Sequence, residues 1–224
     1  MSGYLLKFKQ RYSVKIGGRK YPVVKIGNQL WMAENLDWKF TGCDIAPAGS
    51  PSTPSAWYYN NDEVSYGIDG TYKCGLLYNW YAAKYIDDNK ATLLPDGWHV
   101  PSFGEYETLC TVVAPEGAGY HVNYKAGRKL RAIDGYIVSS SPIWPSDWNG
   151  NDESGFHALP AGSRDYYGNF SGLNDYSCIW SITPVGKEDN IYYFQMWKGE
   201  ESASYSAWGN KLTGFSIRLV KDLT

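Results

Sequence analysis

Most of this sequence consists of short aromatic and β-branched segments that Gly and Pro interrupt. The chain has 24 Gly and 11 Pro among its 224 residues, and each cluster of them favours a turn. Runs of this length fit strands better than helices, which usually need about ten residues or more. Only two segments have helical spacing. We therefore expect an α+β protein of two helices, short antiparallel strands and long ordered loops.

The clearest local signal is a helix start at residues 101–105, Pro-Ser-Phe-Gly-Glu. Ser102 and Glu105 form a capping box, in which each side chain accepts a hydrogen bond from the other residue's backbone N–H. Apolar residues follow at helical spacing. This pattern predicts a helix over 103–113. A second, largely buried helix is predicted over 76–83, Leu-Leu-Tyr-Asn-Trp-Tyr-Ala-Ala.

Strand patterns lie at both ends of the sequence. Residues 11–31 alternate in a way that predicts a β-hairpin of two short strands around Gly17-Gly18, with a second turn at Gly27-Asn28. Residues 41–73 are rich in Gly, Pro, Ser, Asn and Asp and should form a long ordered loop region. An alternating strand is predicted over 215–220.

Length and composition predict one folded domain over residues 1–224. A mass of 25.2 kDa is enough to bury a core, and 43% hydrophobic with 20% charged residues is ordinary for a globular protein. Aromatic residues make up 17% of the chain, and most of them are Tyr. We assign five of them to the core, namely Trp31, Trp80, Trp98, Phe156 and Phe215.

Charge and hydropathy disfavour two classes of partner. The chain has 21 Lys and Arg against 23 Asp and Glu, a net charge of −2, and no basic run, so nucleic acid is a poor candidate. No apolar stretch approaches the roughly 18 residues of a membrane-spanning helix. The short Tyr4-Leu5-Leu6 run is too brief for the apolar part of a signal peptide. We expect no membrane insertion and no visible signal peptide.

Motifs for enzymatic chemistry are missing from the sequence. The chain has three histidines, His99, His121 and His157, but no G-x-S-x-G motif with a serine nucleophile that a histidine could activate. No H-E-x-x-H, P-loop or G-x-G-x-x-G motif occurs either. We interpret His99 and His157 as half-buried structural residues. The chain is therefore not expected to be an enzyme.

The four cysteines are far apart in the sequence and include no C-x-x-C pair, which argues against zinc-ribbon and thioredoxin-type motifs. They are Cys43, Cys74, Cys110 and Cys178. Buried thiols are the favoured interpretation. A disulfide between Cys43 and Cys74 is the alternative.

One acidic segment, residues 147–153, partly follows the pattern of a calcium-binding EF-hand loop. The loop needs Gly at its sixth position and a bidentate Glu at its twelfth, where this chain has Asp152 and Ala158. We therefore expect a solvated acidic turn and no cofactor. An irregular Ca²⁺ site near Asp147, Asn149 and Asp152 is the alternative.

The window 163–211 is the most informative for function. Of its 49 residues, 22 are Tyr, Ser, Gly or Asn, and three more are Trp. Antibody binding sites have a similar composition, since Tyr and Trp give large contact areas at low entropy cost while Ser, Gly and Asn adapt their hydrogen bonds. A plain β-rich region with polar turns is the alternative explanation.

Alternation within residues 192–197 predicts which side chains of this window face outward. Side chains of a strand point to opposite faces in turn. Tyr192, Phe194 and Met196 should therefore face the core. Tyr193, Gln195 and Trp197 should form an exposed row, which would be a costly surface without a partner.

Six segments resemble the Fibrobacter succinogenes major paralogous domain, a bacterial and phage branch of the C-type lectin-like fold. They are V-K-I-G-N-Q-L-W-M-A-E-N-L (24–36), L-Y-N-W-Y-A-A (77–83), L-P-D-G-W-H-V-P-S (94–102), G-F-H-A-L-P-A-G (155–162), W-S-I-T (180–183) and G-F-S-I-R (214–218). The resemblance spans about residues 12–222 in the family's order. It implies a C-type lectin-like fold but names no ligand.

The C-terminal part also resembles variable proteins that diversity-generating retroelements diversify. In those proteins, adenine changes in Asn-type codons between the G-F-x-A-L-P-A-G and G-F-S-[IV]-R segments alter a ligand-binding face. The residues here that such changes could produce are Asp165, Tyr166, Tyr167, Asn169, Ser171, Asn174, Asp175, Tyr176, Ser177, Ser202, Ser204, Tyr205 and Ser206. Lys187, Glu188, Gln195, Met196 and Trp197 would be fixed.

These resemblances favour a receptor-binding or adhesin-type protein on a virion, in the extracellular space or on a cell surface. The expected partner is a protein or glycan of a cell surface, and the protein itself can be an oligomer. The candidate ligand-binding residues are Asp165, Tyr166, Tyr167, Asn169, Asn174, Asp175, Tyr176, Ser177, Tyr193, Gln195, Trp197, Ser202, Ser204, Tyr205 and Trp208. The aromatic residues among them are the expected anchors.

Two alternatives remain at this point. The first is a structural module of a surface assembly, whose aromatic face packs against a neighbouring subunit. The second is an enzyme similar to formylglycine-generating enzymes, which have a pair of reactive cysteines late in the chain where this sequence has only Cys178. The calcium motifs E-P-N, Q-P-D and W-N-D of sugar-binding C-type lectins are also missing, so the resemblance does not imply calcium-dependent sugar binding.

Overall fold

The structure, a computed structural model, describes residues 12–66, 74–133, 144, 150–186 and 190–223, except for the side chains of Ser206 and Trp208. Its strands are β1 (Tyr12–Ile16), β2 (Arg19–Ile26), β3 (Gln29–Met32), β4 (Asp44–Ile45), β5 (Ser55–Trp57), β6 (Leu77–Tyr78), β7 (Trp98–His99), β8 (Ala118–Gly119), β9 (Val122–Asn123), β10 (Ala161–Arg164), β11 (Phe170–Leu173), β12 (Tyr176–Pro184), β13 (Asn190–Trp197), β14 (Ala203–Asn210) and β15 (Val220–Asp222). Its helices are α1 (Glu63–Tyr66), α2 (Trp80–Asp88), α3 (Lys90–Leu93), α4 (Phe103–Val113) and α5 (Ala126–Leu130), with the 3₁₀ turns η1 (Tyr59–Asn61) and η2 (Pro115–Gly117).

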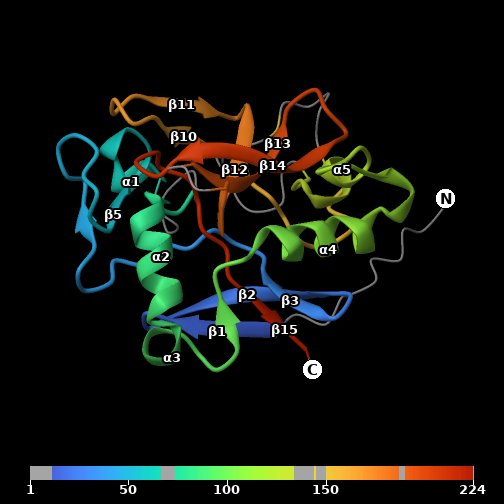
Figure 1. Ribbon diagram of the computed structural model, residues 1–224, viewed down its shortest axis with the longest axis horizontal. Helices are drawn as coiled ribbons and strands as arrows, with labels where there is room; N and C mark the ends of the chain where they lie inside the picture. The colour runs from blue at the N-terminus through green and yellow to red at the C-terminus, as the bar shows by residue number, and fades with distance from the viewer. Residues whose placement is uncertain (1–11, 67–73, 134–143, 145–149, 187–189, 224) are drawn as a thin grey trace.

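Three sheets organise the fold. A five-stranded sheet has the order β1-β2-β3-β15-β7, a seven-stranded sheet the order β11-β10-β12-β13-β14-β9-β8, and a small one the order β4-β5-β6. In Figure 1 the five-stranded sheet lies below the seven-stranded one. Helix α4 contacts both β2 and the strands β12 to β14, so it packs between the two large sheets. Strand β15 brings the C-terminal segment beside β3.

The α+β class is confirmed, with two differences from the expected architecture. Five α-helices are described instead of two, because three short ones of four or five residues lie in segments that have no helical period. The pairing is also mixed, since β10 runs parallel to β12 and β4 runs parallel to β5. The remaining strand pairs of the described chain are antiparallel.

The predicted helix over 103–113 is confirmed at both ends as α4. The Ser102 hydroxyl accepts a hydrogen bond from Glu105 N, and the Glu105 carboxylate accepts one from Ser102 N at 2.7 Å, so both halves of the capping box are present. The other predicted helix, over 76–83, is wrong in its bounds. Asn79 Oδ1 accepts from Ala82 N and caps a helix that begins only at Trp80, while Leu77 and Tyr78 before it form β6.

The N-terminal hairpin is confirmed, and a third strand follows the second turn. Strands β1 and β2 pair from Tyr12↔Val23 to Ile16↔Arg19, and β3 pairs with β2 beyond Gly27-Asn28. Of the loop region 41–73, the described part contains β4, β5, η1 and α1, and residues 67–73 lie outside the described residues. The predicted strand over 215–220 is wrong, because Phe215 and Ser216 form isolated bridges and β15 begins only at Val220.

Two clusters of buried side chains make up the core. One contains Trp98, Trp180 and Phe215, and the other contains Trp31 and Phe156. Four of the five predicted core aromatics are therefore confirmed. The fifth, Trp80, is only partly buried and packs against the first cluster.

Strands β2, β12 and β13 contribute side chains to both clusters. Val23 and Trp180 belong to the first cluster, whereas their neighbours Val24 and Ile179 belong to the second. Successive side chains of a strand point to opposite faces. Both faces of these strands are therefore covered by other parts of the protein, which limits how far any of their residues can be exposed.

All four cysteines lie in the described part of the chain, and each is a thiol. Cys74, Cys110 and Cys178 are buried and Cys43 is half-buried, so the expectation of buried thiols holds for three of them. The alternative Cys43–Cys74 disulfide is not formed. Among the described residues, no helix combines the length and the hydropathy required to span a membrane.

Candidate ligand-binding surface

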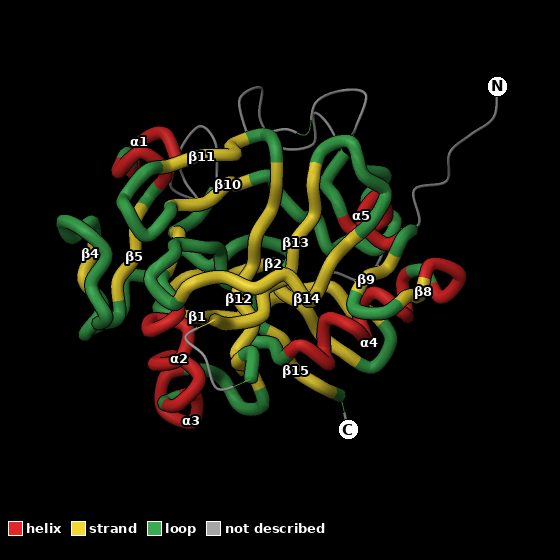
Figure 2. The backbone as a smooth tube through the Cα atoms, turned by 45° about the horizontal axis from the view of Figure 1, so that its top comes forward, coloured by secondary structure: helices red, strands yellow, loops and turns green. Residues whose placement is uncertain are grey.

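Most exposed residues of the window 163–211 lie in or beside three turns, which join β10 to β11, β11 to β12 and β13 to β14. We call this the candidate surface. It comprises the β10–β11 turn (165–169), the β11–β12 turn (174–175), the residue pair Tyr176 and Trp197, and the β13–β14 turn (198–202). Figure 2 shows the β10–β11 hairpin and the neighbouring ends of β12, β13 and β14 on one side of the molecule, with β15 on the other.

The β10–β11 turn is fixed by one carboxylate. Asp165 Oδ1 accepts hydrogen bonds from Tyr167 N at 2.9 Å and from Asn169 N at 2.8 Å, and Asp165 Oδ2 accepts one from Asn169 Nδ2 at 3.0 Å. Burial raises the pKa of Asp165, but these hydrogen bonds outweigh it and lower the pKa below its ordinary value. Such a bonded turn holds Tyr166 and Tyr167 outward, with ring centroids 4.1 Å apart.

A second aromatic pair lies across the β12–β13 ladder. Tyr176 and Trp197 are opposite each other in register, with ring centroids 4.6 Å apart. The Tyr176 hydroxyl is 2.9 Å from both Ser163 Oγ and Ser171 Oγ. These two hydrogen bonds tie β12 to β10 and β11, so the Tyr176 ring is held in place before any ligand arrives.

Two buried arginines support the candidate surface from below. Arg164 lies 4.1 Å from the Trp57 ring centroid and donates to Gly49 O at 2.6 Å, which anchors β10 to the loop before β5. Arg131 Nη1 donates to the carbonyls of Trp197 and Glu200, each at 2.6 Å, which fixes the β13–β14 turn. Burial lowers the pKa of Arg131 to about 10, so it remains charged at neutral pH.

The structure separates the fifteen predicted site residues by exposure. Exposed side chains are those of Tyr166, Tyr167, Asn169 and Trp197; half-buried ones are those of Asp165, Asn174, Asp175, Tyr176, Tyr193, Gln195, Ser202 and Ser204. Ser177 and Tyr205 are buried, and the side chain of Trp208 lies outside the described residues.

Ser177 and Tyr205 are corrections to the predicted site. Ser177 is 1% exposed within β12, opposite Met196. Tyr205 is 2% exposed, and its hydroxyl donates to Gly119 O at 3.2 Å while its ring packs on Phe103. Neither side chain can contact a ligand at the surface.

The predicted alternation within β13 is confirmed for Phe194 and Met196, which are buried. Trp197 is 40% exposed, as expected. Tyr192, Tyr193 and Gln195 differ from prediction, because all three are half-buried. Tyr193 packs on Phe215 with centroids 4.5 Å apart, and burial raises its pKa. The exposed row is therefore smaller than alternation alone predicts, since both faces of β13 are covered.

Sequence reasoning missed Arg131, Arg164 and Ser163. Each acts through contacts with residues far away in the chain, and no local motif indicates such a contact. The sequence indicates Ser171 only as a codon-reachable residue and gives no sign of its hydrogen bond to Tyr176. Ser and Arg in a β-rich window are too common to indicate their partners.

The other chemical predictions have mixed outcomes. Asp147 and Asn149 of the alternative Ca²⁺ site lie outside the described residues, and Asp152 instead binds His157 through both carboxylate oxygens. The interpretation of His99 and His157 as half-buried, hydrogen-bonded residues is confirmed. Burial raises the pKa of the Cys178 thiol, so this thiol stays protonated at neutral pH.

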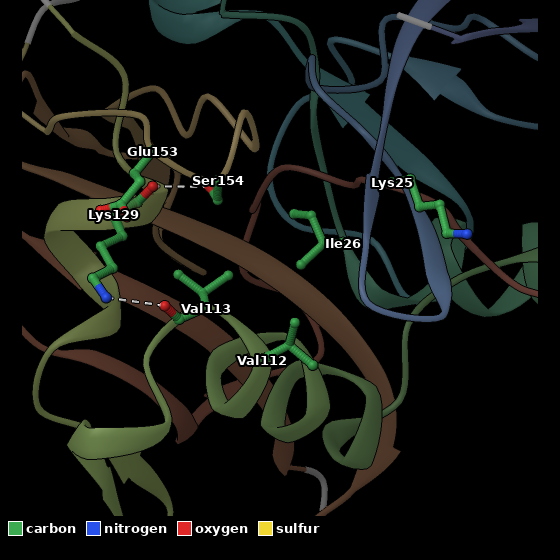
Figure 3. Close-up of a pocket in the computed structure, with 7 residues that line it drawn as sticks. All are labelled: Lys25, Ile26, Val112, Val113, Lys129, Glu153 and Ser154. Carbon is green, nitrogen blue, oxygen red and sulfur yellow. Dashed lines mark hydrogen bonds between the residues drawn. The ribbon is translucent and has the colours of Figure 1, made fainter. Parts of the chain in front are cut away.

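A shallow pocket of about 240 Å³ lies away from the candidate surface, between β2, α4 and α5 (Figure 3). Its lining residues are Lys25, Ile26, Val112, Val113, Lys129, Glu153 and Ser154. Lys129 Nζ donates to Val113 O at 3.1 Å, so the charged group is already engaged. Nothing in this lining resembles a catalytic arrangement.

Comparison with known proteins gives one result. Neither a curated protein nor a solved structure matches the chain. The family model of the Fibrobacter succinogenes major domain matches residues 24–221, which include all strands of the seven-stranded sheet and the whole candidate surface. The chain therefore belongs to the Fibrobacter succinogenes major domain family.

Proposed function

We propose that this protein is a ligand-binding protein of the receptor-binding or adhesin type, which grips a protein or glycan of a cell surface through the candidate surface. The observation that carries the proposal is that exposed aromatic rings stand on backbone or beside side chains that hydrogen bonds already hold in place. Tyr167 is 75% exposed on the turn that Asp165 closes, and Trp197 is 40% exposed beside the doubly bonded Tyr176. Binding costs less entropy when its anchors are already ordered.

The scaffold of this surface is, in our proposal, C-type lectin-like, and the protein is displayed on a phage particle or a bacterial surface. The return of β15 to β3, with α2 and α4 as the two longest helices, supports the fold. Several copies on one particle would raise the overall affinity without new contacts.

We also propose that the candidate surface is diversified. Tyr166, Tyr167 and Asn169 are exposed, lie in a turn and belong to the residue types that adenine changes in Asn codons can produce. Turns of this kind tolerate substitution better than strand interiors do. The strands below the turn would stay constant and keep the scaffold folded.

Binding of the purified protein to a glycan array and to a panel of intact bacterial cells tests the function. The test variant is the double substitution Tyr166→Ser and Tyr167→Ser. A matched control is Tyr120→Ser with Tyr124→Ser, two tyrosines that are 87% and 60% exposed near the opposite edge of the same sheet. We expect the test variant to lose at least about tenfold in affinity, because hot-spot aromatics dominate such interfaces.

The control variant should bind like the unmodified protein, and both variants should melt at nearly the same temperature as it does. If the test and control variants bind equally well, or lose affinity equally, the candidate surface does not bind the ligand. A stable oligomer in light scattering that dissociates when Trp197 is replaced by Ser would instead favour the structural-module alternative.

A further inference from the structure

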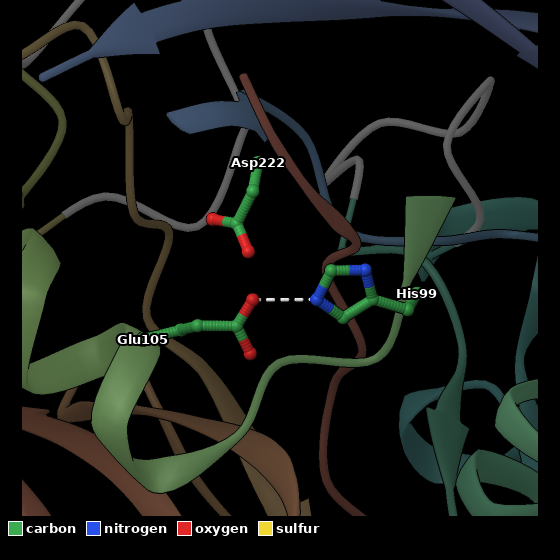
Figure 4. A group of neighbouring side chains, drawn as sticks. All are labelled: His99, Glu105 and Asp222. Atoms are coloured by element: carbon green, nitrogen blue, oxygen red, sulfur yellow. Dashed lines mark hydrogen bonds and ion pairs between the residues drawn. The ribbon is translucent and has the colours of Figure 1, made fainter. Parts of the chain in front are cut away.

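Three side chains from distant parts of the sequence converge at the opposite end of the molecule from the β10–β11 hairpin. His99 ends β7, Glu105 lies in the first turn of α4, and Asp222 ends β15. One nitrogen or oxygen atom from each lies within 4.8 Å of the other two. Figure 4 shows all three side chains pointing into one space. Asp222 is exposed, so this space is open to solvent.

The hydrogen-bond partners of His99 indicate which ring nitrogen is available to a ligand. His99 Nδ1 is 3.1 Å from Gly97 O, and a carbonyl oxygen only accepts, so Nδ1 carries the proton. In the neutral ring, Nε2 then has a lone pair. That lone pair faces Glu105 Oε1 at 2.5 Å, and an ionised carboxylate is also only an acceptor. The contact therefore holds either a proton on Nε2, as in an imidazolium–carboxylate ion pair, or a metal ion in place of that proton.

Outer hydrogen bonds hold each of the three groups in position. Glu105 Oε2 accepts from both Ser102 N and Ser102 Oγ at 2.7 Å, which leaves Oε1 directed at His99. Asp222 Oδ1 accepts from Gln29 Nε2 at 3.1 Å. A metal-binding histidine usually donates its other ring N–H to a carbonyl or carboxylate, as His99 does to Gly97. Each group thus has the supporting contact expected of a metal ligand.

We propose that His99 Nε2, Glu105 Oε1 and the Asp222 carboxylate form a binding site for one divalent transition-metal cation of the Zn²⁺ class. One imidazole nitrogen and two carboxylate oxygens are ligands that Zn²⁺ accepts, and a water molecule can take the fourth position. The two negative charges and the neutral ring balance a dication. Bonds of about 2.0–2.2 Å to the ion require His99 and Glu105 to move slightly apart as it replaces a shared proton.

Binding here would join the C-terminal strand to the start of α4. Strand β15 is only three residues long and pairs with β3 and β7. The bound ion would add a second attachment between β15 and the rest of the fold. The site uses none of the residues of the candidate surface, so a test of metal binding here is independent of the proposed function.

Calorimetric titration of ZnCl₂ into protein that has been treated with a chelator and dialysed tests the site. We expect one ion per chain, and a melting temperature that rises when Zn²⁺ is added. Asp222→Asn should weaken binding at least about tenfold, while its amide oxygen can still accept from Gln29. The matched control is Asp44→Asn, which changes an exposed carboxylate on β4 outside the cluster and should bind like the unmodified protein.

Nitrogen-15 NMR of His99 in the unmodified protein gives a second readout that needs no variant. A bound ion should shift Nε2 and leave Nδ1 protonated. Failure of Zn²⁺ to bind, together with protons on both ring nitrogens at neutral pH, would overturn the site in favour of an imidazolium–carboxylate pair. Equal Zn²⁺ affinity in Asp222→Asn and Asp44→Asn would overturn it as well.

Discussion

At the scale of single residues, Tyr176 shows how the candidate surface is ordered. Its hydroxyl is shared between Ser163 Oγ and Ser171 Oγ, and its ring lies beside Trp197. A tyrosine without these partners would sample several rotamers and would have to be fixed on binding. The hydrogen bonds move that entropy cost from the binding step into folding.

Tyr176→Phe keeps the ring and removes both hydrogen bonds. We expect the free energy of unfolding to fall by about 1 kcal/mol, because the two Ser hydroxyls lose their shared partner. Urea denaturation measures the change. Tyr120→Phe is the control, since that side chain is 87% exposed and should leave stability unaltered. Identical stability losses in the two variants would contradict a structural role of the Tyr176 hydroxyl.

Asp165 makes the order of the β10–β11 turn dependent on pH. The pKa of Asp165 is lower in the folded protein than its ordinary value of 3.8. The ionised carboxylate therefore stabilises the turn fully above pH 3.8, and this stabilisation is lost as the pH falls through the lower pKa of the folded state. Arg164, whose positive charge is the nearest in sequence, stays protonated throughout this range. We predict that the Tyr167 and Asn169 amide resonances in NMR stay constant from pH 7 to about pH 5 and move only in stronger acid.

Asp165→Asn is the control for this titration, because it removes the charge and keeps one acceptor oxygen. Its amide resonances should not follow the same acid transition. A transition near pH 6 in the unmodified protein would show that the turn depends on another group.

At the scale of elements, α4 connects the two large sheets and depends on its N-terminal cap. Tyr106, Leu109 and Cys110 are its buried side chains, and the Tyr106 hydroxyl donates to Trp180 O at 3.0 Å. The first turn of a helix has backbone N–H groups without helical partners. The capping box of Ser102 and Glu105 satisfies two such groups where the chain enters the helix.

Ser102→Ala removes the capping hydroxyl. We expect a loss of about 1 kcal/mol in the free energy of unfolding, the usual cost of losing a helix cap. Thr111→Ala is the control, since Thr111 is exposed within the same helix and makes no capping contact. Circular dichroism measures the thermal unfolding of both variants. Equal melting temperatures of the two variants would contradict the role of the cap.

Local signals explain which elements were predictable. The capping box lies within four consecutive residues, so the sequence alone was enough to place α4. The start of α2 was not, because its cap Asn79 also accepts a hydrogen bond from Ser55 N of β5, a contact that no local pattern indicates. Long-range pairing also overrides alternation in β13, where Tyr193 should be exposed but packs on Phe215.

At the scale of the whole molecule, Arg218 holds three distant segments together. It is completely buried, donates to Asn35 Oδ1 and His157 O at 2.8 and 2.9 Å, and also donates to Phe156 O. Its guanidinium carbon is 4.6 Å from the Phe156 ring centroid. Burial lowers the pKa of Arg218 to about 10, so it is still charged at neutral pH. The G-F-S-I-R segment thus has a structural role in addition to its place in the family's sequence pattern.

Arg218→Lys should destabilise the protein by about 3 kcal/mol or more, because a lysine ammonium cannot reach all three acceptors and leaves buried groups unpaired. Guanidinium denaturation measures the loss. The same substitution at Arg128, whose side chain is 60% exposed, should cost little. Similar stability of the two variants would contradict the assigned role of Arg218.

The limits of predicting the site also arise at this scale. The composition of 163–211 correctly located exposed rings such as Tyr167 and Trp197. It could not separate them from Tyr205, which has the same chemistry but lies beneath the β8–β9 hairpin. Burial of that kind depends on how α4 and the sheet pack together, and no window of sequence contains this information.

Sequencing the coding segment for residues 163–211 in many closely related isolates from one environment is the most direct test of a diversified binding surface. We predict amino-acid changes concentrated at exposed residues such as Tyr166, Tyr167 and Asn169. Ser177 and Tyr205 should stay constant, because both are buried although their codons are equally reachable. An invariant segment, or changes spread equally over buried and exposed positions, would contradict the proposal of a diversified binding surface.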